Sequence, residues 1–237
     1  MKRIALIAGA TGVLGRAVCR ELHACGVLVV CGYAGRRQEA EALAAELGGF
    51  AVELRSDMEL AETVRAVAER HGGLDILVNA VGMNREGSAV ALSQEEWRCV
   101  LEVNLDFAFG LTQAALPHML LRRYGRVIHL SSVAGRIGGR GQINYAVSKA
   151  ALERMVRAFA LEVGRKGITV NCVAPGVIVS DMTERVRAEH GEALLSNIAC
   201  RRFGKPEEVA KAVAFLAGED ANYINGIVLP VDGGMLL

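Results

Sequence analysis

The sequence predicts one α/β domain, in which a doubly wound parallel β-sheet is flanked by helices on both faces. Short runs rich in β-branched residues alternate with longer helical patterns along the whole 237-residue chain. Most of these runs are continuously apolar, which is typical of parallel strands covered on both sides. No Pro/Gly/Ser-rich linker, charge block or internal repeat interrupts the alternation, so the single domain is expected to span residues 1–237.

The expected elements follow one another in strand–helix order. Runs of Ile, Val and Leu mark the strands, and apolar residues three and four apart mark the helices. Glycine closes several helices as a C-terminal cap, at Gly26, Gly48, Gly72 and Gly167. Strands are expected at 3–9, 26–32, 50–54, 74–82, 125–132, 168–175 and 226–234. Helices are expected at 15–25, 37–47, 57–72, 95–120 and 145–165.

Composition and charge exclude several classes of protein. Hydrophobic residues make up 52% of the chain and charged residues 22%, which favours a filled core over disorder. A net charge of +1 argues against a nucleic-acid partner. The six cysteines form no C-x-x-C pair and the five histidines no H-x-x-x-H pair, so we expect no metal and a reducing compartment. The apolar start breaks at Gly9, too early for a signal peptide or membrane span, which favours a cytoplasmic protein without membrane contact.

A glycine-rich turn follows the first expected strand. Gly9, Gly12 and Gly15 lie between that strand and the next helix. Glycines there permit a tight turn and close backbone approach to phosphate, and the helix N-terminus offers free N–H groups to a pyrophosphate. The turn therefore predicts a dinucleotide site that includes Thr11, Val13 and Leu14, although a merely structural turn is the alternative.

The end of the second strand indicates which dinucleotide is bound. An acidic residue commonly holds the ribose of NAD(H) near this point, but here Tyr33 is followed by Arg36 and Arg37. Guanidinium groups match a phosphate well, so the sequence favours NADP(H). Alternatively, both arginines simply line the exposed start of a helix.

A tyrosine and a lysine lie four residues apart at the start of the helix expected from 145. About one turn separates Tyr145 from Lys149, so both side chains leave the same helix face. A neighbouring cation favours phenolate, which makes the pair a candidate acid/base device. The alternative is a tyrosine packed on a lysine stem.

Together these motifs resemble the short-chain dehydrogenase/reductase family, a Rossmann-type fold, over nearly the whole chain. Within that family the sequence looks most like the 3-oxoacyl-(acyl-carrier-protein) reductases. The resemblance places the active-site Y-x-x-x-K on Tyr145 and Lys149. It places the catalytic serine on Ser132, thirteen residues before the tyrosine, and a catalytic asparagine on Asn104. Ser131 is an equally available hydroxyl, and only the spacing selects Ser132.

The resemblance also implies further cofactor contacts. The Pro-Gly turn in "VAPGVIVSDMT" matches the segment that contacts the nicotinamide carboxamide, and "LDILVNAVG" matches the family's fourth-strand motif. These matches imply contacts from Asn79, Gly82, Pro175, Gly176, Ile178 and Ser180, with Asp57 at the adenine.

Two departures from the family pattern affect the same region. Val13 stands where the middle glycine of T-G-x-x-x-G-x-G belongs, with Gly12 one residue early, and Ala8 replaces the threonine. Ala80 replaces the second asparagine of N-N-A-G, a side chain that ties neighbouring strands.

In the chemistry that the resemblance implies, Tyr145 gives a proton to a ketone oxygen as hydride reaches the carbon, and Lys149 lowers the tyrosine pKa and holds the nicotinamide ribose. Ser132 donates a second hydrogen bond to that oxygen. Asn104 holds a water that links Lys149 to solvent. For Asn104 the alternative is a side chain that bends its helix.

The remaining expectations concern substrate and partners. Residues 181–203 are expected to form a helical lid over the substrate. Arg123 and Lys166 match basic positions that meet acidic acyl carrier protein in the related reductases, although helix C-termini attract such residues anyway. Apolar outer faces of 95–120 and 145–165 resemble the family's four-helix interface, so a homotetramer is expected, with a dimer as the alternative.

Three functions remain open from the sequence. The first is NADPH-dependent reduction of a 3-oxoacyl thioester on acyl carrier protein, in fatty-acid, polyketide or polyene synthesis. The second is a dehydrogenase or reductase for a free alcohol, acyl-CoA or sugar. The third is a non-catalytic NADP(H)-binding partner subunit, against which the full set of four catalytic residues argues.

Overall fold

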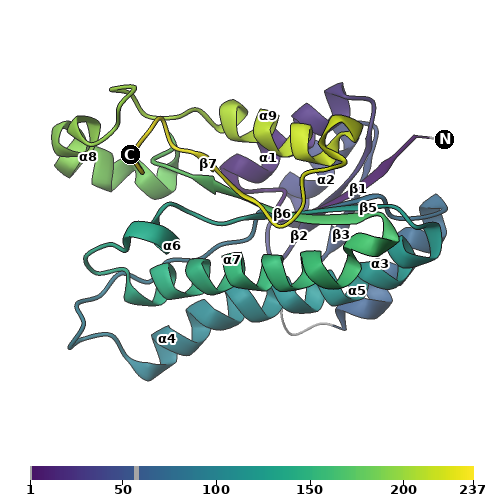
Figure 1. Cartoon of the computed structure of the whole chain (residues 1–237), viewed down its shortest axis with the longest axis horizontal. Helices are drawn as coiled ribbons and strands as arrows, with labels where there is room; N and C mark the ends of the chain where they lie inside the picture. Colours follow the sequence, from purple (N-terminus) through teal and green to yellow (C-terminus); the bar gives the residue numbers. More distant parts are fainter. Residues whose placement is uncertain (1, 56–58) are drawn as a thin grey trace.

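The computed structural model describes residues 2–55 and 59–237 of the chain, and in this part the strands form one seven-stranded sheet (Figure 1). The strand order is β3-β2-β1-β4-β5-β6-β7, and every neighbouring pair is parallel. The predicted doubly wound fold is therefore confirmed. The strands are β1 Ile4–Ala8, β2 Leu28–Tyr33, β3 Phe50–Glu53, β4 Ile76–Asn79, β5 Gly125–Leu130, β6 Ile168–Pro175 and β7 Val228–Val231.

Helices cover both faces of the sheet. Figure 1 shows one helical layer above the sheet and a second below it. The upper layer contains α1 Val13–Ala24, α2 Arg37–Glu46 and α9 Pro206–Ala217. The lower layer contains α3 Leu60–His71, α4 Gln94–Leu101, α5 Phe107–Arg122 and α7 Ile143–Val163. Two further helices, α6 Ala134–Ile137 and α8 Asp181–Ser196, lie beyond the carboxyl ends of the strands.

The core is divided by the sheet into two apolar clusters. Successive residues of a buried strand point to opposite faces, so Leu6 packs with the lower helices while Ile7 packs with the upper ones. This is why the strands read as continuous apolar runs rather than as alternating ones. Gly72 and Gly167 end their helices at φ of 77° and 79°, as the sequence predicted.

The direction of winding changes between β1 and β4. β1 pairs with β2 on one side and β4 on the other, so the connections after these strands leave toward opposite faces of the sheet. A crevice opens at this point beyond the carboxyl ends, which is where ligands bind in sheets of this kind. The predicted site residues after β1, β2 and β4 therefore come to one edge.

A continuous helical segment runs from Gln94 to Arg122 through a π-helical turn, Glu102–Asp106, that joins α4 to α5. By length and composition this segment could cross a membrane, with a mean hydropathy of 1.2. Half of its apolar window is buried inside the protein, as in the core helix of a globular domain.

Candidate active site

The glycine turn between β1 and α1 leaves no room for side chains at two positions. Gly9 has a φ of 77°, and a Cβ on Gly15 would lie 2.1 Å from the carbonyl oxygen of Gly9. Gly12 is the N-cap of α1, where no side chain caps the helix and no acidic residue lies in the first turn. The free N–H groups at the N-terminus of α1 and the positive end of its dipole thus favour binding of an anion at this turn.

A cleft of about 1150 Å³ lies over this turn and fits a dinucleotide. The substitution of Val13 for the usual glycine does not close it, because Val13 lines the cleft and is 37% exposed. Ala80 and Gly82, after β4, form the opposite side. Of the predicted cofactor residues, those that line this cleft are Gly9, Thr11, Gly12, Val13, Leu14, Gly15, Arg36, Gly82 and Ser180.

The end of the cleft near β2 is basic. Arg36 lines it as predicted, together with Arg16 and Arg55. A carboxylate lies among them: Glu39 forms an ion pair with Arg16, and Nη1 of Arg36 is 3.6 Å from the same carboxylate. Arg16 was not predicted from the sequence, although its place one residue beyond Gly15 was a usable signal.

Two other residues predicted near β2 lie elsewhere. Arg37 turns away to form an ion pair with Glu41 and is 72% exposed. Tyr33 is buried at the end of β2. Asp57 lies outside the described residues.

A second cleft of about 740 Å³ contains the predicted catalytic tyrosine and serine. Ser132 follows β5 and Tyr145 lies in the first turn of α7, and both line this cleft, where the Ser132 hydroxyl favours the charged form of the phenol. Ser131 differs, because its hydroxyl is turned to Glu153 at 3.0 Å. The structure therefore brings Ser132, rather than Ser131, to the phenol. Leu14 and Ser180 line both clefts, so the clefts meet at this point.

Lys149 lies behind the tyrosine rather than against its hydroxyl. Its Nζ donates to the carbonyl oxygen of Leu130 at 2.9 Å and lies 5.7 Å from the centre of the Tyr145 ring. A Cβ on Gly82 would come within 3.3 Å of the same Nζ, so the ammonium lies directly below the cofactor cleft.

Burial dominates the electrostatics of this pair. It raises the pKa of Tyr145, and the hydrogen bond from Ser132 acts in the opposite direction. It also lowers the pKa of Lys149 to about 8. The expected lowering of the tyrosine pKa by Lys149 is not what the structure shows, because desolvation disfavours the charged form of both groups. Tyr145 is therefore a protonated phenol at neutral pH, which suits a proton donor.

Asn104 occupies the centre of the π-helical turn and is fully buried. Its Oδ1 accepts from the backbone N–H of Met83 at 2.7 Å, and its Nδ2 donates to the Met83 carbonyl oxygen at 2.9 Å. Nδ2 also donates to Ser148, next to Lys149, at 2.9 Å. Asn104 thus holds the chain at Met83, which lines the cofactor cleft, against α7.

Asn79 is buried below the cofactor cleft and does not line it. Its Oδ1 accepts from the N–H of Val81 at 3.0 Å, and its Nδ2 lies 3.4 Å from Nδ1 of His129 on β5. The asparagine missing at Ala80 would have tied neighbouring strands, and the Asn79–His129 contact ties β4 to β5 instead. His129 was missed because only the pairing of the two strands reveals its partner.

The substrate cleft is bounded by two loops and one helix. The loops are joined by a hydrogen bond from the N–H of Gly87 to the carbonyl oxygen of Gly141. The opposite wall is α8, which lies in the predicted lid segment and departs from helical geometry at His190. Pro175, Gly176, Ile178 and Ser180 line this cleft rather than the cofactor cleft, apart from Ser180, which lines both. Met235, near the chain end, was not predicted to reach it.

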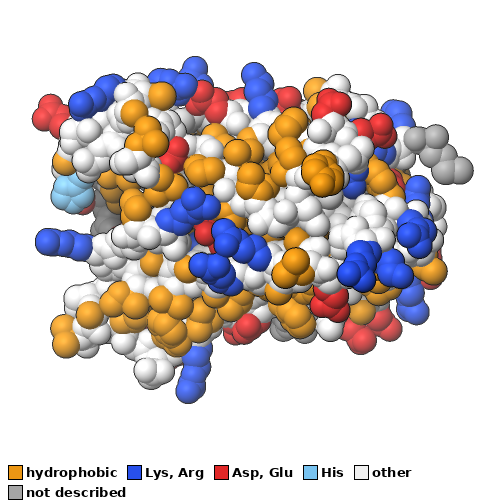
Figure 2. Space-filling view, viewed as in Figure 1, with side chains coloured by type: hydrophobic (Ala, Val, Ile, Leu, Met, Phe, Trp, Pro, Cys, Tyr) orange, Lys and Arg blue, Asp and Glu red, His pale blue; other side chains and the backbone are white. Residues whose placement is uncertain are grey.

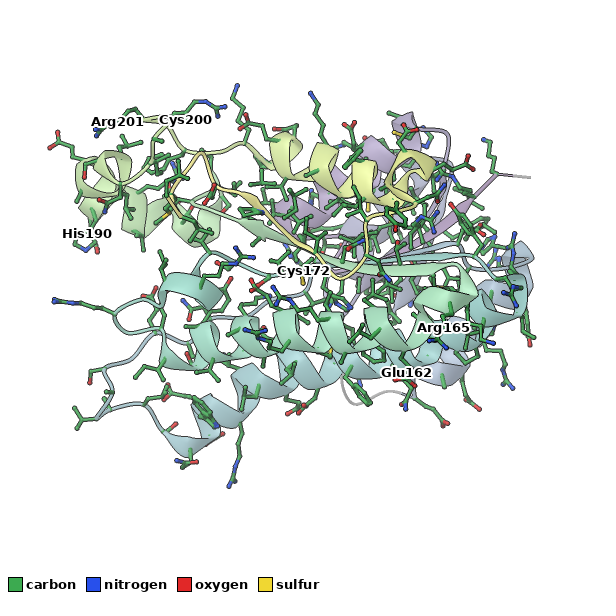
Figure 3. All side chains as sticks on the ribbon, in the orientation of Figure 1. Glu162, Arg165, Cys172, His190, Cys200 and Arg201 are labelled. Atoms are coloured by element: carbon green, nitrogen blue, oxygen red, sulfur yellow. The ribbon has the colours of Figure 1, made fainter. Side chains whose placement is uncertain are left out.

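Arg123 and Lys166 lie far from the catalytic residues of the same chain. Arg123 follows α5 just before β5 begins, and Lys166 precedes β6, so both lie at the amino edge of the sheet. Tyr145 and Ser132 lie at the carboxyl edge. Figure 3 shows the separation: Arg165, next to Lys166, is at one end of the molecule and His190 of α8 at the other.

A parallel sheet with a glycine turn at its switch point and a Ser–Tyr–Lys set beside it defines a dinucleotide-dependent oxidoreductase. The chain belongs to the short-chain dehydrogenase/reductase family. The profile of a family described as enoyl-(acyl carrier protein) reductase matches residues 9–236.

Comparisons with individual proteins agree with this assignment. The chain is 39% identical to 3-oxoacyl-[acyl-carrier-protein] reductase FabG of Haemophilus influenzae, over 99% of this chain and 98% of that protein. It is 41% identical to nodulation protein G of Rhizobium sp. strain N33, over 99% and 97%. A crystal structure of gluconate 5-dehydrogenase from Burkholderia cenocepacia, in complex with NADP and tartrate, superposes with a TM-score of 0.95 at 26% identity, over 100% and 96%.

Proposed function

We propose that this protein reduces a 3-oxoacyl thioester carried on acyl carrier protein to the 3-hydroxyacyl thioester, with NADPH as the reductant. The observation that carries the proposal is that Ser132 and Tyr145 line one cleft, which opens into the dinucleotide cleft. Full-length relatives that bear the name 3-oxoacyl-[acyl-carrier-protein] reductase support the substrate class.

The residues divide the work of reduction at one carbonyl. NADPH, when bound, supplies the hydride that reduces the carbonyl carbon. Tyr145 donates its phenol proton to the carbonyl oxygen, and Ser132 donates a hydrogen bond that stabilises the negative charge developing there. Lys149, buried below Gly82, is the cation next to this reaction. Because burial keeps Tyr145 protonated, the site is ready to act as a proton donor.

The choice of NADPH rests on the basic end of the cofactor cleft. Arg16 and Arg36 both reach it and match the charge and shape of a 2′-phosphate. The gluconate 5-dehydrogenase structure, which is a complex with NADP, supports the same choice.

A carrier-bound substrate brings an acidic partner, for which Arg123 and Lys166 are the basic residues predicted from the sequence. These residues lie at the opposite edge of the sheet from their own cleft. In a twofold contact that pairs α5 antiparallel with its copy, the amino edge of one subunit would lie beside the carboxyl edge of the other, where the cleft is. We therefore propose that a partner subunit supplies these cations, in a homotetramer or a dimer.

The surface of the lower helices fits such a contact. Apolar side chains of α5 and α7 remain exposed, with Leu121 at 86% and Leu161 at 85%. Figure 2 shows hydrophobic side chains along the lower edge of the molecule and Lys and Arg side chains near the end of α7. Covering the apolar side chains in an assembly removes them from water.

The six cysteines are free, as expected in the cytoplasm, where we place the protein.

The test is NADPH oxidation, followed by absorbance, with 3-oxoacyl, 2-enoyl and free 3-oxo ester substrates. We expect the 3-oxoacyl carrier thioester to be turned over best, and Tyr145→Phe to abolish turnover while NADPH still binds. Preference for the enoyl thioester or for an acyl-CoA, or faster NADP+ reduction with a free alcohol or sugar, would replace the proposal. NADPH binding without turnover of any substrate would favour a non-catalytic partner subunit.

A further inference from the structure

A partly buried ion pair joins α6 to α7 behind the catalytic residues. Nε of Arg136 lies 3.5 Å from Oε2 of Glu153, whose side chain is 11% exposed. The Arg136 guanidinium also donates to the carbonyl oxygen of Val228 on β7 at 3.2 Å. A carboxylate at this depth is costly unless it is paired and hydrogen-bonded, and Glu153 is both.

The second oxygen of the Glu153 carboxylate reaches the strand that carries the catalytic serine. Ser131 donates to Oε1 of Glu153 at 3.0 Å and lies 3.3 Å from the carbonyl oxygen of Lys149. Glu153 is one helical turn beyond Lys149 on α7. One carboxylate therefore connects the residue next to Ser132 with the helix that carries both Tyr145 and Lys149.

The other partner of the pair sits in α6, which begins two residues after Ser132. A Cβ on Gly135 would lie 2.9 Å from the backbone nitrogen of Ala150, so α6 is pressed directly onto the backbone of α7. The N–H of Ala134 donates to Oγ of Ser132 at 3.2 Å. This bond occupies a lone pair of Ser132 and leaves its O–H free to donate to Tyr145 or to the substrate oxygen.

We propose that Arg136 and Glu153 are positioning residues that fix the hydroxyl of Ser132 against Tyr145. The ion pair holds α6 on α7, α6 presents the N–H of Ala134, and that N–H sets the direction in which Ser132 donates. The hydrogen bond from Ser131 to Glu153 fixes the end of β5 from the other side. The proposal rests on the reduction proposed above and adds the residues that orient its oxyanion donor.

A purely structural ion pair would behave differently from a positioning pair. Loss of a structural pair lowers stability and leaves the reaction of the folded enzyme unchanged. Loss of a positioning pair lowers kcat only in an enzyme that still has the Ser132 hydroxyl. A double-mutant cycle between Glu153 and Ser132 separates these cases.

The experiment compares Glu153→Gln in the wild type and in Ser132→Ala, with NADPH and a 3-oxoacyl thioester as substrates. Glutamine keeps the length of the side chain but removes the charge that holds Arg136. We expect kcat to fall about tenfold in the wild-type background and less than about twofold in Ser132→Ala, with the dissociation constant of NADPH unchanged within about twofold. Glu162→Gln is the matched control, because Glu162 lies on the same helix but is exposed (Figure 3). We expect it to leave kcat unchanged.

Equal losses in both backgrounds, or no loss in the wild type, would overturn the proposal. A second variant guards against simple unfolding: Arg136→Met with Glu153→Leu replaces the pair by apolar side chains, a change that often preserves stability. We expect this variant to retain its thermal unfolding midpoint and NADPH affinity but not its kcat; recovery of wild-type kcat would refute the positioning role. Turnover by the wild type reports separately on the proposed function.

Discussion

Asn79 donates a hydrogen bond to Nδ1 of His129, and this contact joins β4 to β5 beneath the cofactor cleft. The direction of this hydrogen bond follows from the contact made by the other ring nitrogen, Nε2. The hydroxyl of Thr112 donates to the carbonyl oxygen of Ala108 at 2.7 Å, so its oxygen must accept the proton of Nε2 of His129 at 3.0 Å. Nδ1 is then without a proton and accepts from Asn79 at 3.4 Å. The neutral imidazole with its proton on Nε2 is the form that this arrangement holds.

This arrangement makes the stability of the protein depend on pH. Burial lowers the pKa of His129 from 6.5 to about 3, so the unfolded chain binds a proton at pH values where the folded chain does not. Stability from His129 is therefore complete above pH 6.5 and is lost as pH falls through that value toward 3. Relative to His129→Gln, the wild-type free energy of unfolding should drop by about 2 kcal/mol between pH 7 and pH 5.

Chemical denaturation of both proteins at a series of pH values measures this difference, because the other titrating groups are common to both. A difference that stays constant over that range would show that His129 is protonated in the folded state. The NMR tautomer pattern of His129 gives an independent check on the direction of the hydrogen bonds.

The fold was predictable because its determinants are local. Most of the seven strands are largely apolar runs bounded by polar or glycine residues, and periodicity separates such runs from the helices. The glycine turn was predictable for a similar reason: Gly9 and Gly15 are required by contacts within one short segment. The identity of the catalytic residues came from spacing along the chain, which the resemblance supplied.

The supporting residues were not predictable, because they depend on contacts between distant segments. Glu153 reads in sequence as an ordinary helical glutamate, and only the packing of α6 on α7 buries it against Arg136. His129 reads as one residue of an apolar strand until β4 is placed beside β5. The direction of the pKa shift at Tyr145 was also missed, because burial depth is a property of the assembled fold.

Glu39 is expected to weaken binding of the cofactor phosphate. Its carboxylate lies among Arg16 and Arg36 in the basic end of the cleft, where it competes with an incoming phosphate for the same guanidinium groups. Glu39→Gln should lower KM for NADPH about threefold to tenfold and leave KM for NADH unchanged, consistent with the strength of charge-assisted pairs. Steady-state kinetics with both cofactors measures this.

The control for Glu39 is another glutamate of the same helix. Glu41 forms an ion pair with Arg37 outside the cofactor cleft, so Glu41→Gln should change neither KM. Similar effects from both substitutions would mean that the change reflects overall charge rather than the cleft.

Lys149 is expected to set an upper pH limit on catalysis by the free enzyme. Its pKa is lowered to about 8, so the ammonium loses its proton as pH rises through that value. The charged form stabilises the negative charge that develops on the substrate carbonyl oxygen, so kcat/KM for NADPH should fall above about pH 8. Lys149→Arg should remove this fall, because a guanidinium group stays protonated. An inflection near pH 8 that persists in Lys149→Arg assigns the titration to another group. An NMR titration of Nζ measures the same pKa without turnover.

The subunit contact proposed along α5 and α7 predicts that recognition of the carrier protein depends on assembly, whereas the chemical step does not. Leu161 is 85% exposed on α7, and Leu121 is 86% exposed on α5, so a charge at either position should remain in water in a single subunit but oppose burial in an assembly. Leu161→Glu should therefore yield smaller species by light scattering.

If Arg123 and Lys166 act on a neighbouring cleft, the smaller species should lose about tenfold in kcat/KM for a carrier-bound thioester, as expected when interfacial charge pairs are removed. It should keep turnover of a small thioester surrogate within about twofold, because the Ser132–Tyr145 pair lies within one chain. Equal loss on both substrates would mean that assembly supports the fold of the active site. Unchanged carrier turnover in a dissociated enzyme would remove Arg123 and Lys166 from carrier recognition, because within one chain they lie at the opposite edge of the sheet from the cleft.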